Sequence, residues 1–217
     1  MPRYFITGTD TGIGKTWFTR WLVRAWRLQG YNAVGLKPIS SGDRDDAVFL
    51  REASGNVLSL DETNPIHFLQ PAAPLIAART ENRTIDFPTL NRSILTTANR
   101  FSHVAVEGVG GWRVPLASGY EVRDWARDLA LPVVVVALNR LGVLNHTLLT
   151  LESIHAAGLT CAAVVLNAGP EASPDLDFVR RENVLLLQSL LALPVFEFDG
   201  RAEAAGRVPV CLGGEEA

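Results

Sequence analysis

A glycine-rich segment near the start of the chain ends in a lysine and a threonine. It reads Gly-Thr-Asp-Thr-Gly-Ile-Gly-Lys-Thr (8–16) and joins a short apolar run to a helix-length segment. Glycines at 12 and 14 let backbone N–H groups wrap around an anion, and the following helix N-terminus adds further free N–H groups. Lys15 can reach the β- and γ-phosphates of a nucleotide, and the Thr16 hydroxyl can bind Mg²⁺. The segment therefore predicts a phosphate-binding loop.

The spacing of this loop is longer by one residue than the usual G-x-x-x-x-G-K-[ST] pattern. Residues 9–13 separate the first glycine from the Gly-Lys pair. A glycine-rich tight turn without a ligand is the alternative interpretation. We disfavour it because the apolar run, the glycines, the Lys-Thr pair and the helix follow one another in register.

Lysine is rare in this chain, and its positions are informative. Of the 20 cationic residues, 18 are arginine and only Lys15 and Lys37 are lysine. Lys37 directly follows an apolar run, in Leu-Lys-Pro-Ile-Ser-Ser-Gly (36–42). A chain so rich in arginine could have used it at both positions. Lysine there indicates that a compact ammonium is needed, which a planar guanidinium cannot imitate. We therefore predict that Lys37 belongs to the phosphate site, with a surface lysine at a strand end as the alternative.

Carboxylates that could bind a metal follow two of the apolar runs. Glu107 ends the run 103–107 and precedes the turn Gly-Val-Gly-Gly (108–111). In nucleotide enzymes an acidic residue at this place orients Mg²⁺ or its water, and we favour this role over a solvated strand end. Asp45 and Asp46 begin a helix, and either could be a helix cap or a second metal carboxylate.

Alternating strands and helices must position these residues. Short runs rich in Val, Ile and Leu without in–out alternation are typical of strands buried on both faces. They lie at 4–7, 33–36, 104–106, 133–138 and 162–166, with a sixth near 195–198. Helix-length segments lie between them, at 15–28, 46–53, 87–100, 122–129, 146–157 and 177–191. This alternation predicts an α/β fold with a mostly parallel sheet and helices on both faces, which binds ligands at the carboxyl ends of its strands.

Composition limits the class of protein. The chain has 217 residues, and at about 150 residues per domain we expect a single domain over 1–217. The net charge of −3 disfavours general nucleic-acid binding, and no apolar run approaches the roughly 18 residues that a membrane span needs. Neither a signal peptide nor a disulfide framework is evident. The two isolated cysteines, Cys161 and Cys211, favour a reducing cytoplasm.

Two further expectations concern packing. The segment 61–88, with prolines at 65, 71, 74 and 88, is predicted to be loop-rich and to serve as a lid or a dimer contact. The tryptophans at 17, 21 and 26 are predicted to pack along the first helix.

Further motifs follow these in a fixed order. They are Asn-Pro-Ile-His-Phe (64–68), Glu-Gly-Val-Gly-Gly-Trp (107–112), Val-Pro-Leu (114–116), Leu-Pro-Val (131–133), Arg-Leu-Gly-Val-Leu-Asn-His (140–146) and Leu-Asn (166–167). Together with the loop and the segment 37–42, they resemble the ATP-dependent dethiobiotin synthetase family over residues 3–169. The resemblance implies a single-domain, P-loop NTPase-like fold.

The resemblance also implies an ATP- and Mg²⁺-dependent ligase. Its substrates are 7,8-diaminononanoate, CO₂ and ATP. One amine captures CO₂ as a carbamate, ATP converts the carbamate to a carbamic–phosphoric anhydride, and the second amine closes the ureido ring of dethiobiotin. The other products are ADP and phosphate. The resemblance further implies a homodimer, without nucleic-acid or membrane partners.

Roles carry over residue by residue from this resemblance. Lys37 is expected between the carbamate and the γ-phosphate, and Lys15, Lys37 and Thr11 form the catalytic set. Thr16, Asp46 and Glu107 are expected to hold Mg²⁺. The expected nucleotide contacts are Gly12, Ile13, Gly14, Lys15, Thr16, Trp17, Asp46, Glu107 and Asn167, the last in the place of the family's adenine-reading asparagine.

Substrate contacts are implied in the same way. Thr11, Lys37, Ser41 and Gly110 are expected near the reacting end. The helix start at Gly142, Val143, Leu144 and Asn145 resembles the segment that takes the tail carboxylate across a dimer interface, as suits a helix N-terminus. Asn145 has a second interpretation as a helix cap, and His146 as a packing residue.

The chain departs from the family near Pro194. Residues 189–200 read Ser-Leu-Leu-Ala-Leu-Pro-Val-Phe-Glu-Phe-Asp-Gly, where the family has Gly-x-Ile-Pro and then a loop on the base and ribose. Base specificity is therefore left open.

Two other functions compete with the ligase. One is a related P-loop enzyme that activates a different carboxylate or carbamate, and the other is a nucleotide-dependent switch that binds a partner. Many switches carry a lysine where this chain has Asp10, which argues against the second.

Overall fold

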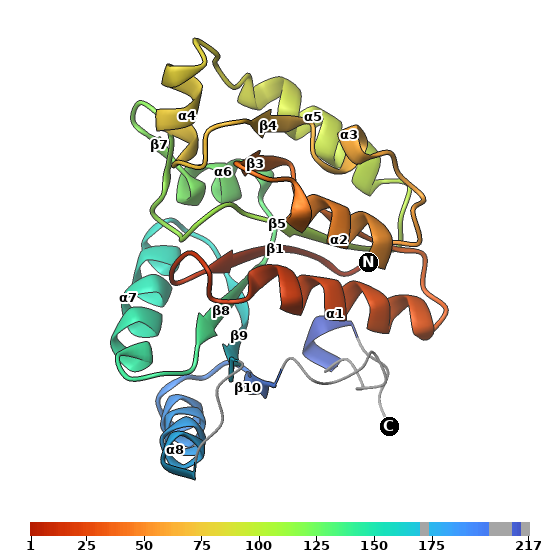
Figure 1. Ribbon diagram of the computed structural model, residues 1–217. Helices are drawn as coiled ribbons and strands as arrows, with labels where there is room; N and C mark the ends of the chain where they lie inside the picture. Colours follow the sequence, from red (N-terminus) through yellow and green to blue (C-terminus); the bar gives the residue numbers. More distant parts are fainter. Residues whose placement is uncertain (170–173, 200–209, 214–217) are drawn as a thin grey trace.

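A six-stranded parallel sheet forms the centre of the computed structural model, which describes residues 1–169, 174–199 and 210–213 (Figure 1). The strand order is β10-β9-β8-β1-β5-β2, and every neighbouring pair is parallel. The strands are β1 (Arg3–Gly8), β2 (Ala33–Leu36), β5 (His103–Glu107), β8 (Val133–Leu138), β9 (Cys161–Asn167) and β10 (Val195–Phe198). They coincide with the predicted runs to within one residue at each end, which confirms the α/β fold class.

Side chains on alternate residues of each strand pack on opposite faces of the sheet. In β1, Phe5 contributes to one buried cluster, and Tyr4 and Ile6 contribute to the other. The valines of β8 divide in the same way. Because both faces are covered, the strands are apolar throughout, which is why their sequences show no alternation.

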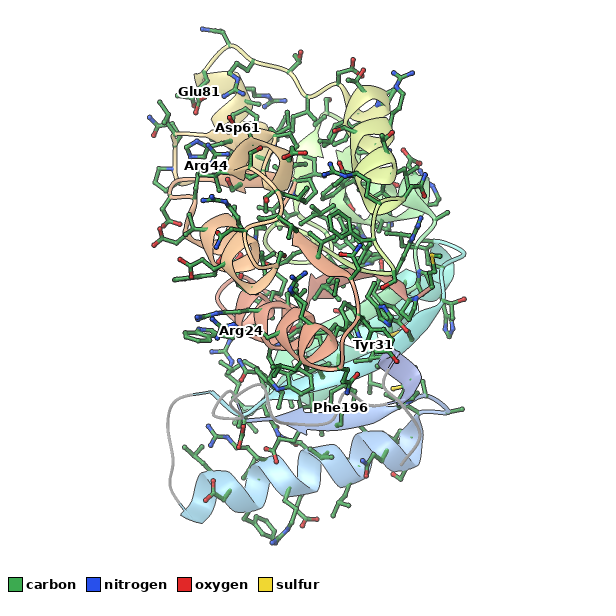
Figure 2. All side chains as sticks on the ribbon, turned by 90° about the vertical axis from the view of Figure 1, so that its right-hand side faces the viewer. Arg24, Tyr31, Arg44, Asp61, Glu81 and Phe196 are labelled. Carbon is green, nitrogen blue, oxygen red and sulfur yellow. The ribbon has the colours of Figure 1, made fainter. Side chains whose placement is uncertain are left out.

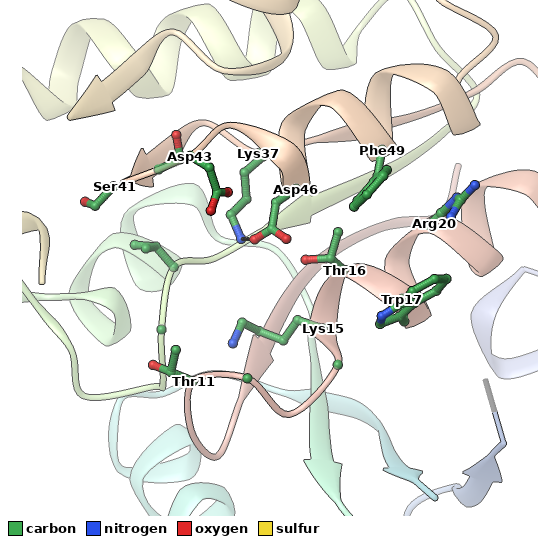
Figure 3. Close-up of a pocket in the computed structure, with 15 residues that line it drawn as sticks. Thr11, Lys15, Thr16, Trp17, Arg20, Lys37, Ser41, Asp43, Asp46 and Phe49 are labelled. Atoms are coloured by element: carbon green, nitrogen blue, oxygen red, sulfur yellow. Dashed lines mark hydrogen bonds and ion pairs between the residues drawn. The ribbon is translucent and has the colours of Figure 1, made fainter. Parts of the chain in front are cut away.

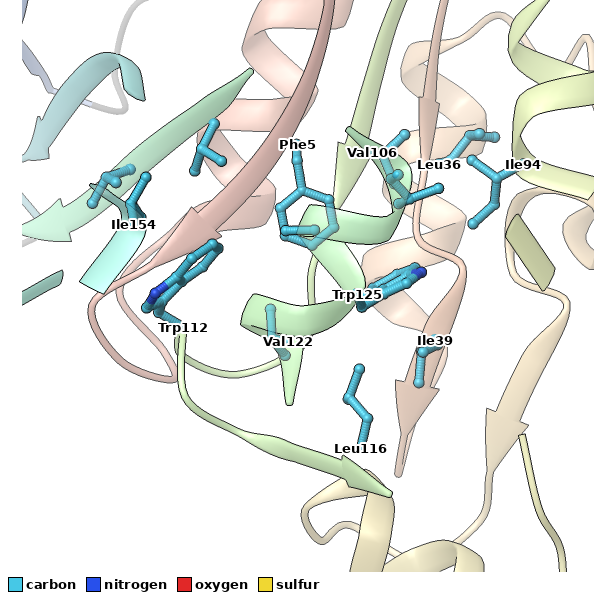
Figure 4. Packing of buried hydrophobic residues seen from close by; sticks show 14 of the residues in the cluster. Phe5, Leu36, Ile39, Ile94, Val106, Trp112, Leu116, Val122, Trp125 and Ile154 are labelled. Carbon is cyan, nitrogen blue, oxygen red and sulfur yellow. The ribbon is translucent and has the colours of Figure 1, made fainter. Parts of the chain in front are cut away.

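Helices cover both faces of the sheet. The helix α1 (Lys15–Leu28) and the short 3₁₀ helix η1 (Val210–Leu212) pack on one face with Phe18, Leu22, Trp26 and Leu212. On the other face lie α5 (Phe87–Ala98), α6 (Val122–Leu129), α7 (Val143–Ala156) and α8 (Pro174–Leu190). The helix α2 (Asp45–Ala53) packs against α1 and β2. On the face that α5, α6, α7 and α8 cover, the Phe5 ring contacts Trp125 of α6 edge-on, with ring centroids 5.2 Å apart (Figure 4).

Three predicted helices have different ends in the structure. The helix α5 ends at Ala98 instead of residue 100, and α8 spans Pro174–Leu190 instead of 177–191. The helix α7 begins at Val143 instead of residue 146, because Gly142 caps it with a left-handed φ of 92°. Asn145 therefore lies inside the first turn, and its interpretation as a helix cap was wrong.

Short elements account for most of what the sequence did not predict. The strands β3 (Ile39–Ser41) and β4 (Ile66–Phe68) form a parallel pair, and β6 (Pro115–Ala117) and β7 (Tyr120–Glu121) form an antiparallel one. The helices α3 (Leu60–Thr63) and α4 (Pro74–Thr80) are similarly brief. The segment 61–88, predicted to be loop-rich, runs through loops at 69–73 and 81–86, but it also contains β4, α4 and most of α3, which the sequence did not predict. Elements this short leave too few residues for a period to show.

Arg44 fixes the chain just before α2. Its guanidinium donates hydrogen bonds to Asn64 Oδ1 at 2.9 Å and to the carbonyl oxygens of Leu60 and Asn64, and it pairs with Asp61 at 2.9 Å. Figure 2 shows Arg44 beside Asp61. These bonds hold the start of α2 against α3 and against Asn64, the residue that ends α3.

The remaining predictions about compartment are compatible with the described residues. Both cysteines are unpaired, and Cys161 is buried as a small apolar side chain. Among the described helices, none combines the length and apolar character that crossing a membrane requires.

Candidate active site

A cavity of about 360 Å³ lies between the glycine-rich loop, the starts of α1 and α2, and the loop after β5 (Figure 3). This volume is in the range of small-molecule sites. Ten residues predicted for the site line it: Thr11, Gly12, Gly14, Lys15, Thr16, Trp17, Lys37, Ser41, Asp46 and Gly110. The site therefore lies at the carboxyl ends of β1, β2 and β5, as a parallel sheet predicts.

The glycine-rich loop depends on its glycines for its shape. Gly12 and Gly14 have φ angles of 72° and 91°, a region that costs other residues energy. A Cβ atom on Gly14 would lie 2.0 Å from Asn167 Nδ2. That amide donates a hydrogen bond to the Ile13 carbonyl oxygen at 2.9 Å, and Asn167 Oδ1 accepts one from Gly169 N at 3.2 Å. The Asn167 side chain thus stabilises the loop through the Ile13 backbone. Its contact with a base stays a prediction.

Lys15 begins α1 and is held inside the loop. Its Nζ donates a hydrogen bond to the Asp10 carbonyl oxygen at 3.0 Å, and the side chain is buried. Burial, and then the nearby charge of Lys37, lower the pKa of Lys15 to about 8. The helix N-cap is Gly14, which offers no side chain to the first N–H groups, so these groups remain available to an anion.

Lys37 lies between two carboxylates. Its Nζ is 2.6 Å from Glu107 Oε1 and 2.6 Å from Asp46 Oδ2. Thr16 donates its hydroxyl hydrogen to the same Glu107 oxygen at 2.7 Å. Burial disfavours the ammonium, but the two carboxylates outweigh it and raise the pKa of Lys37. The structure thus brings together Lys37, Thr16, Asp46 and Glu107 from β2–β3, α1, α2 and β5.

The carboxylates of this group fit a divalent cation. Glu107 is fully buried, and its Oε2 has no hydrogen-bond partner among the described residues. Asp46 lies in the first turn of α2, where Arg44 is the N-cap, so Asp46 is not the cap. Burial raises the pKa of Asp46, but the charge of Lys37 and the hydrogen bond that it donates outweigh burial and lower this pKa. Carboxylate and hydroxyl oxygens are ligands that Mg²⁺ accepts.

Thr11 and Ser41 lie at one end of the cavity (Figure 3), and Gly110 lines it beside Thr11. Ser41 Oγ is buried without a hydrogen-bond partner among the described residues. Gly110 has a φ of 62°, and a Cβ there would lie 2.7 Å from Val114 Cγ2 and 3.4 Å from Thr11 Oγ1. A glycine is therefore required, and the backbone can approach a ligand closely.

Other predicted residues are not brought to this cavity within the described chain. Gly142, Val143, Leu144 and Asn145 lie at the start of α7, after β8, and do not line it. Of the residues 189–200, where the chain was expected to depart from the family, only Gly200 lies outside the described residues, and Val195–Phe198 form β10.

The cavity also contains residues that the sequence analysis missed. They are Arg20, Ser40, Asp43, Phe49 and Val109. Helical spacing could have found two of them, because Arg20 follows Thr16 at i+4 and Phe49 follows Asp46 at i+3. The expected packing of the tryptophans is confirmed for the buried Trp26 and for Trp21, which packs against Phe18 and Phe198, and it is wrong for Trp17, which is 57% exposed at the cavity.

Comparison with solved structures places the fold. MinD of Aquifex aeolicus matches with a TM-score of 0.56 and 14% identity, covering 93% of this chain and 84% of that protein. The signal recognition particle receptor FtsY of Elizabethkingia anophelis matches with a TM-score of 0.55 and 18% identity, covering 90% of this chain and 56% of that one. At these identities the likeness shows the P-loop NTPase-like fold alone.

Comparison of sequences gives the family. A family model described as an AAA domain matches residues 2–198. The ATP-dependent dethiobiotin synthetase BioD of Anaeromyxobacter dehalogenans is 44% identical over 216 residues, 96% of this chain and 97% of that protein. The enzyme of the same name from Akkermansia muciniphila is 44% identical over 167 residues, 77% and 78% of the two chains. The chain therefore belongs to the family of ATP-dependent dethiobiotin synthetases.

Proposed function

We propose that this chain closes the ureido ring of dethiobiotin from 7,8-diaminononanoate, CO₂ and ATP, with Mg²⁺ bound by its own carboxylates. The observation that carries the proposal is the place of Lys37. Its ammonium is buried at 2.6 Å from both Glu107 and Asp46, next to a loop built for phosphates. A carbamate and a γ-phosphate are both anions, and a point-like cation between them lowers their repulsion.

The reaction balances with these groups. One amine of the substrate attacks CO₂ and loses a proton, which gives a carbamate. A carbamate oxygen then attacks the γ-phosphorus, the bond to the β-phosphate oxygen breaks, and ADP leaves. The second amine attacks the carbonyl carbon, loses a proton and expels phosphate as the ring closes. Lys37 would stabilise the charge on the transferred phosphoryl group, and the loop N–H groups and Lys15 would hold the phosphates.

The carboxyl group of Glu107, the Asp46 carboxylate and the Thr16 hydroxyl would hold Mg²⁺. The ion would neutralise charge on the β- and γ-phosphates. Thr11, Ser41 and the backbone at Gly110 would orient the reacting amines at the other end of the cavity. Asn167 keeps a second N–H and a second lone pair beyond its bonds to Ile13 and Gly169, so it could contact adenine while it still supports the loop.

We also propose a homodimer in the cytoplasm. Exposed leucines before and along α7 support the dimer: Leu141, just before the helix, is 93% exposed, and Leu149, at its middle, is 57% exposed. The predicted carboxylate-binding residues Gly142–Asn145 lie in the same segment, so a second copy could present them to the cavity. Two unpaired cysteines suit a reducing compartment.

The test is phosphate release in 7,8-diaminononanoate, bicarbonate and Mg²⁺, with ATP, CTP and GTP in parallel. The control omits the diamine. Release that needs the diamine, with dethiobiotin identified by mass, would support the proposal. Release without the diamine would favour a nucleotide switch, and a different product would favour an enzyme for another carbamate.

A further inference from the structure

A short turn at the end of β3 forms part of the cavity wall. Its residues are Ser41, Gly42 and Asp43, and we call it the Gly42 turn. Ser41 and Asp43 both line the cavity, and in the view of Figure 3 Asp43 lies between Ser41 and Lys37. Gly42 has a φ of 89°, which glycine adopts without a steric cost. The turn therefore brings a hydroxyl and a carboxylate to the end of the cavity where the reacting amines are proposed to bind.

Asp43 differs from the other acidic residue that lines the cavity. Asp46 pairs with Lys37 at 2.6 Å, whereas Asp43 forms no ion pair within the part of the chain that the structure describes. Asp43 Oδ1 accepts a hydrogen bond from the Asp45 backbone N–H at 3.2 Å. A carboxylate offers about four lone-pair sites, so most of those on Asp43 stay open to a ligand.

His67 fixes the Gly42 turn from the neighbouring strand β4. Its Nε2 lies 2.7 Å from the Gly42 carbonyl oxygen. Because a carbonyl oxygen only accepts hydrogen bonds, Nε2 must carry the hydrogen. The Gly42 N–H donates to the Phe68 carbonyl oxygen at 2.9 Å, so β4 binds both backbone groups of Gly42. A Cβ atom on Gly42 would lie 3.1 Å from Pro71 Cβ, which leaves the turn little room to move.

His67 is itself held in place by residues that follow α4. Arg83 Nη1 donates a hydrogen bond to the His67 carbonyl oxygen at 2.7 Å, and its guanidinium lies 4.8 Å from the Phe68 ring centroid. Glu81 pairs with Arg83 at 3.0 Å and accepts a hydrogen bond from the Leu69 backbone N–H at 2.7 Å. The imidazole is therefore a fixed donor to the turn.

The substrate end of the cavity has to accept a cation. At about pH 7 at least one of two neighbouring alkyl amines carries a proton, since a lysine amine has a pKa of about 10.4. Lys15 and Lys37 also line the cavity, and their charges repel an ammonium. A carboxylate without a cationic partner offsets this repulsion. An ammonium has no free electron pair, so holding one amine in this form leaves the other to capture CO₂.

We propose that Asp43 binds an ammonium group of the diamine, and that His67 is a positioning residue that acts through the Gly42 carbonyl group. The carboxylate accepts N–H bonds from the ammonium. The Ser41 Oγ atom, which has no hydrogen-bond partner among the described residues, adds an acceptor. The inference rests on the proposed function, because it takes the substrate to be the diamine. It adds a group that distinguishes a charged amine from a neutral group of similar size.

Calorimetry with two ligands tests the recognition of charge. The diamine and 7,8-dihydroxynonanoate, which has the same carbon chain and neutral hydroxyls, are titrated into the full chain and into Asp43→Asn. The variant keeps the size of the side chain but loses its charge. We expect the diamine to bind about tenfold or more weakly to the variant. Binding of the dihydroxy acid and of ATP with Mg²⁺ should each change less than about twofold.

A matched control removes the same charge two residues along the chain. Asp45 lies in the first turn of α2 and does not line the cavity. Asp45→Asn should change the affinity for either ligand less than about twofold. At saturating diamine, the Mg²⁺ requirement of Asp43→Asn should stay that of the wild type. Circular dichroism should show that all variants are folded.

Two variants of His67 test its positioning role. His67→Phe keeps a ring but removes the donor, whereas His67→Gln keeps an N–H group at a similar reach. We expect His67→Phe to weaken the diamine by about threefold or more, and His67→Gln to recover most of the affinity. In the Asp43→Asn background, His67→Phe should cost less than about twofold, because both residues act on one contact.

Each contrary outcome has a separate meaning. Wild-type protein that binds the dihydroxy acid as tightly as the diamine would overturn the inference, as would Asp43→Asn with unchanged diamine affinity. Equal weakening of both ligands would assign Asp43 to the shape of the cavity and also overturn it. An equal loss from His67→Phe in both backgrounds would remove His67 from its positioning role. All of these results leave the proposed ligase intact if diamine-dependent phosphate release persists, whereas absence of that release is a failure of the proposed function.

Discussion

Lys37 Nζ lies 2.6 Å from Glu107 Oε1, the oxygen that also accepts the Thr16 hydroxyl hydrogen. One buried carboxylate therefore orients both the lysine and the threonine, while its second oxygen is without a partner among the described residues. That second oxygen would be the one to hold Mg²⁺, so Glu107 could bind the ion while Oε1 keeps its contacts with Lys37 and Thr16.

Replacement of Lys37 by arginine should abolish turnover without unfolding the protein. The guanidinium keeps the charge but is planar and wider, and the pocket around Lys37 is closed by two carboxylates at 2.6 Å. Overfilling a buried site costs about 1–3 kcal/mol of unfolding free energy, which a folded domain can tolerate. Diamine-dependent phosphate release and a thermal melt measure the two effects. Activity above a tenth of wild type would remove Lys37 from its proposed place.

The Glu107→Gln variant should need more Mg²⁺ for activity. The amide is neutral and a poorer ligand for a hard cation, so the titration of activity against Mg²⁺ should shift to higher concentration by about tenfold or more. Asp43→Asn is the matched control. Asp43 lines the same cavity, but its carboxylate accepts a hydrogen bond from the Asp45 backbone, so its loss should shift the titration far less. Equal titrations for Glu107→Gln and wild type would count against metal binding by Glu107.

The main sheet and the phosphate loop could be predicted from sequence because local patterns determine them. Strands buried on both faces give apolar runs, and the loop needs glycines at Gly12 and Gly14 for backbone reasons alone. The β3–β4 pair could not be predicted in this way, because Ile39–Ser41 is too short to show a period and its partner lies far along the chain. The same holds for Phe49, whose place in the cavity depends on how α2 packs against α1.

Binding of ATP should take up a proton at high pH. In the free protein the pKa of Lys15 is about 8, so the ammonium is mostly present at about pH 7 and mostly lost at about pH 9. Bound phosphates favour the ammonium and raise this pKa. Calorimetry in two buffers of different ionisation enthalpy should give uptake of nearly one proton at about pH 9 and almost none at about pH 7.

The Lys15→Arg variant controls for this assignment. Its guanidinium stays charged throughout this range, so its binding of ATP should be free of proton uptake at either pH. Uptake that persists in this variant would assign the proton to another group, and no uptake at about pH 9 in the wild type would contradict the lowered pKa.

Gly14→Ala should damage the loop more than Gly12→Ala, although both glycines have positive φ. A Cβ on Gly12 meets nothing within 4 Å, whereas one on Gly14 would lie 2.0 Å from Asn167 Nδ2. Gly12→Ala should therefore lower the unfolding free energy only by the cost of a Cβ on a left-handed residue, about 1–2 kcal/mol. Gly14→Ala should lower it further, because the Asn167 amide must also be displaced. Denaturant unfolding of both variants, each in the wild-type and Asn167→Ala backgrounds, measures the coupling. We expect the excess cost of Gly14→Ala to shrink when Asn167 is truncated, since the clashing amide is then gone. An excess that is the same in both backgrounds would mean that the Asn167 amide is not the group that a Cβ on Gly14 displaces.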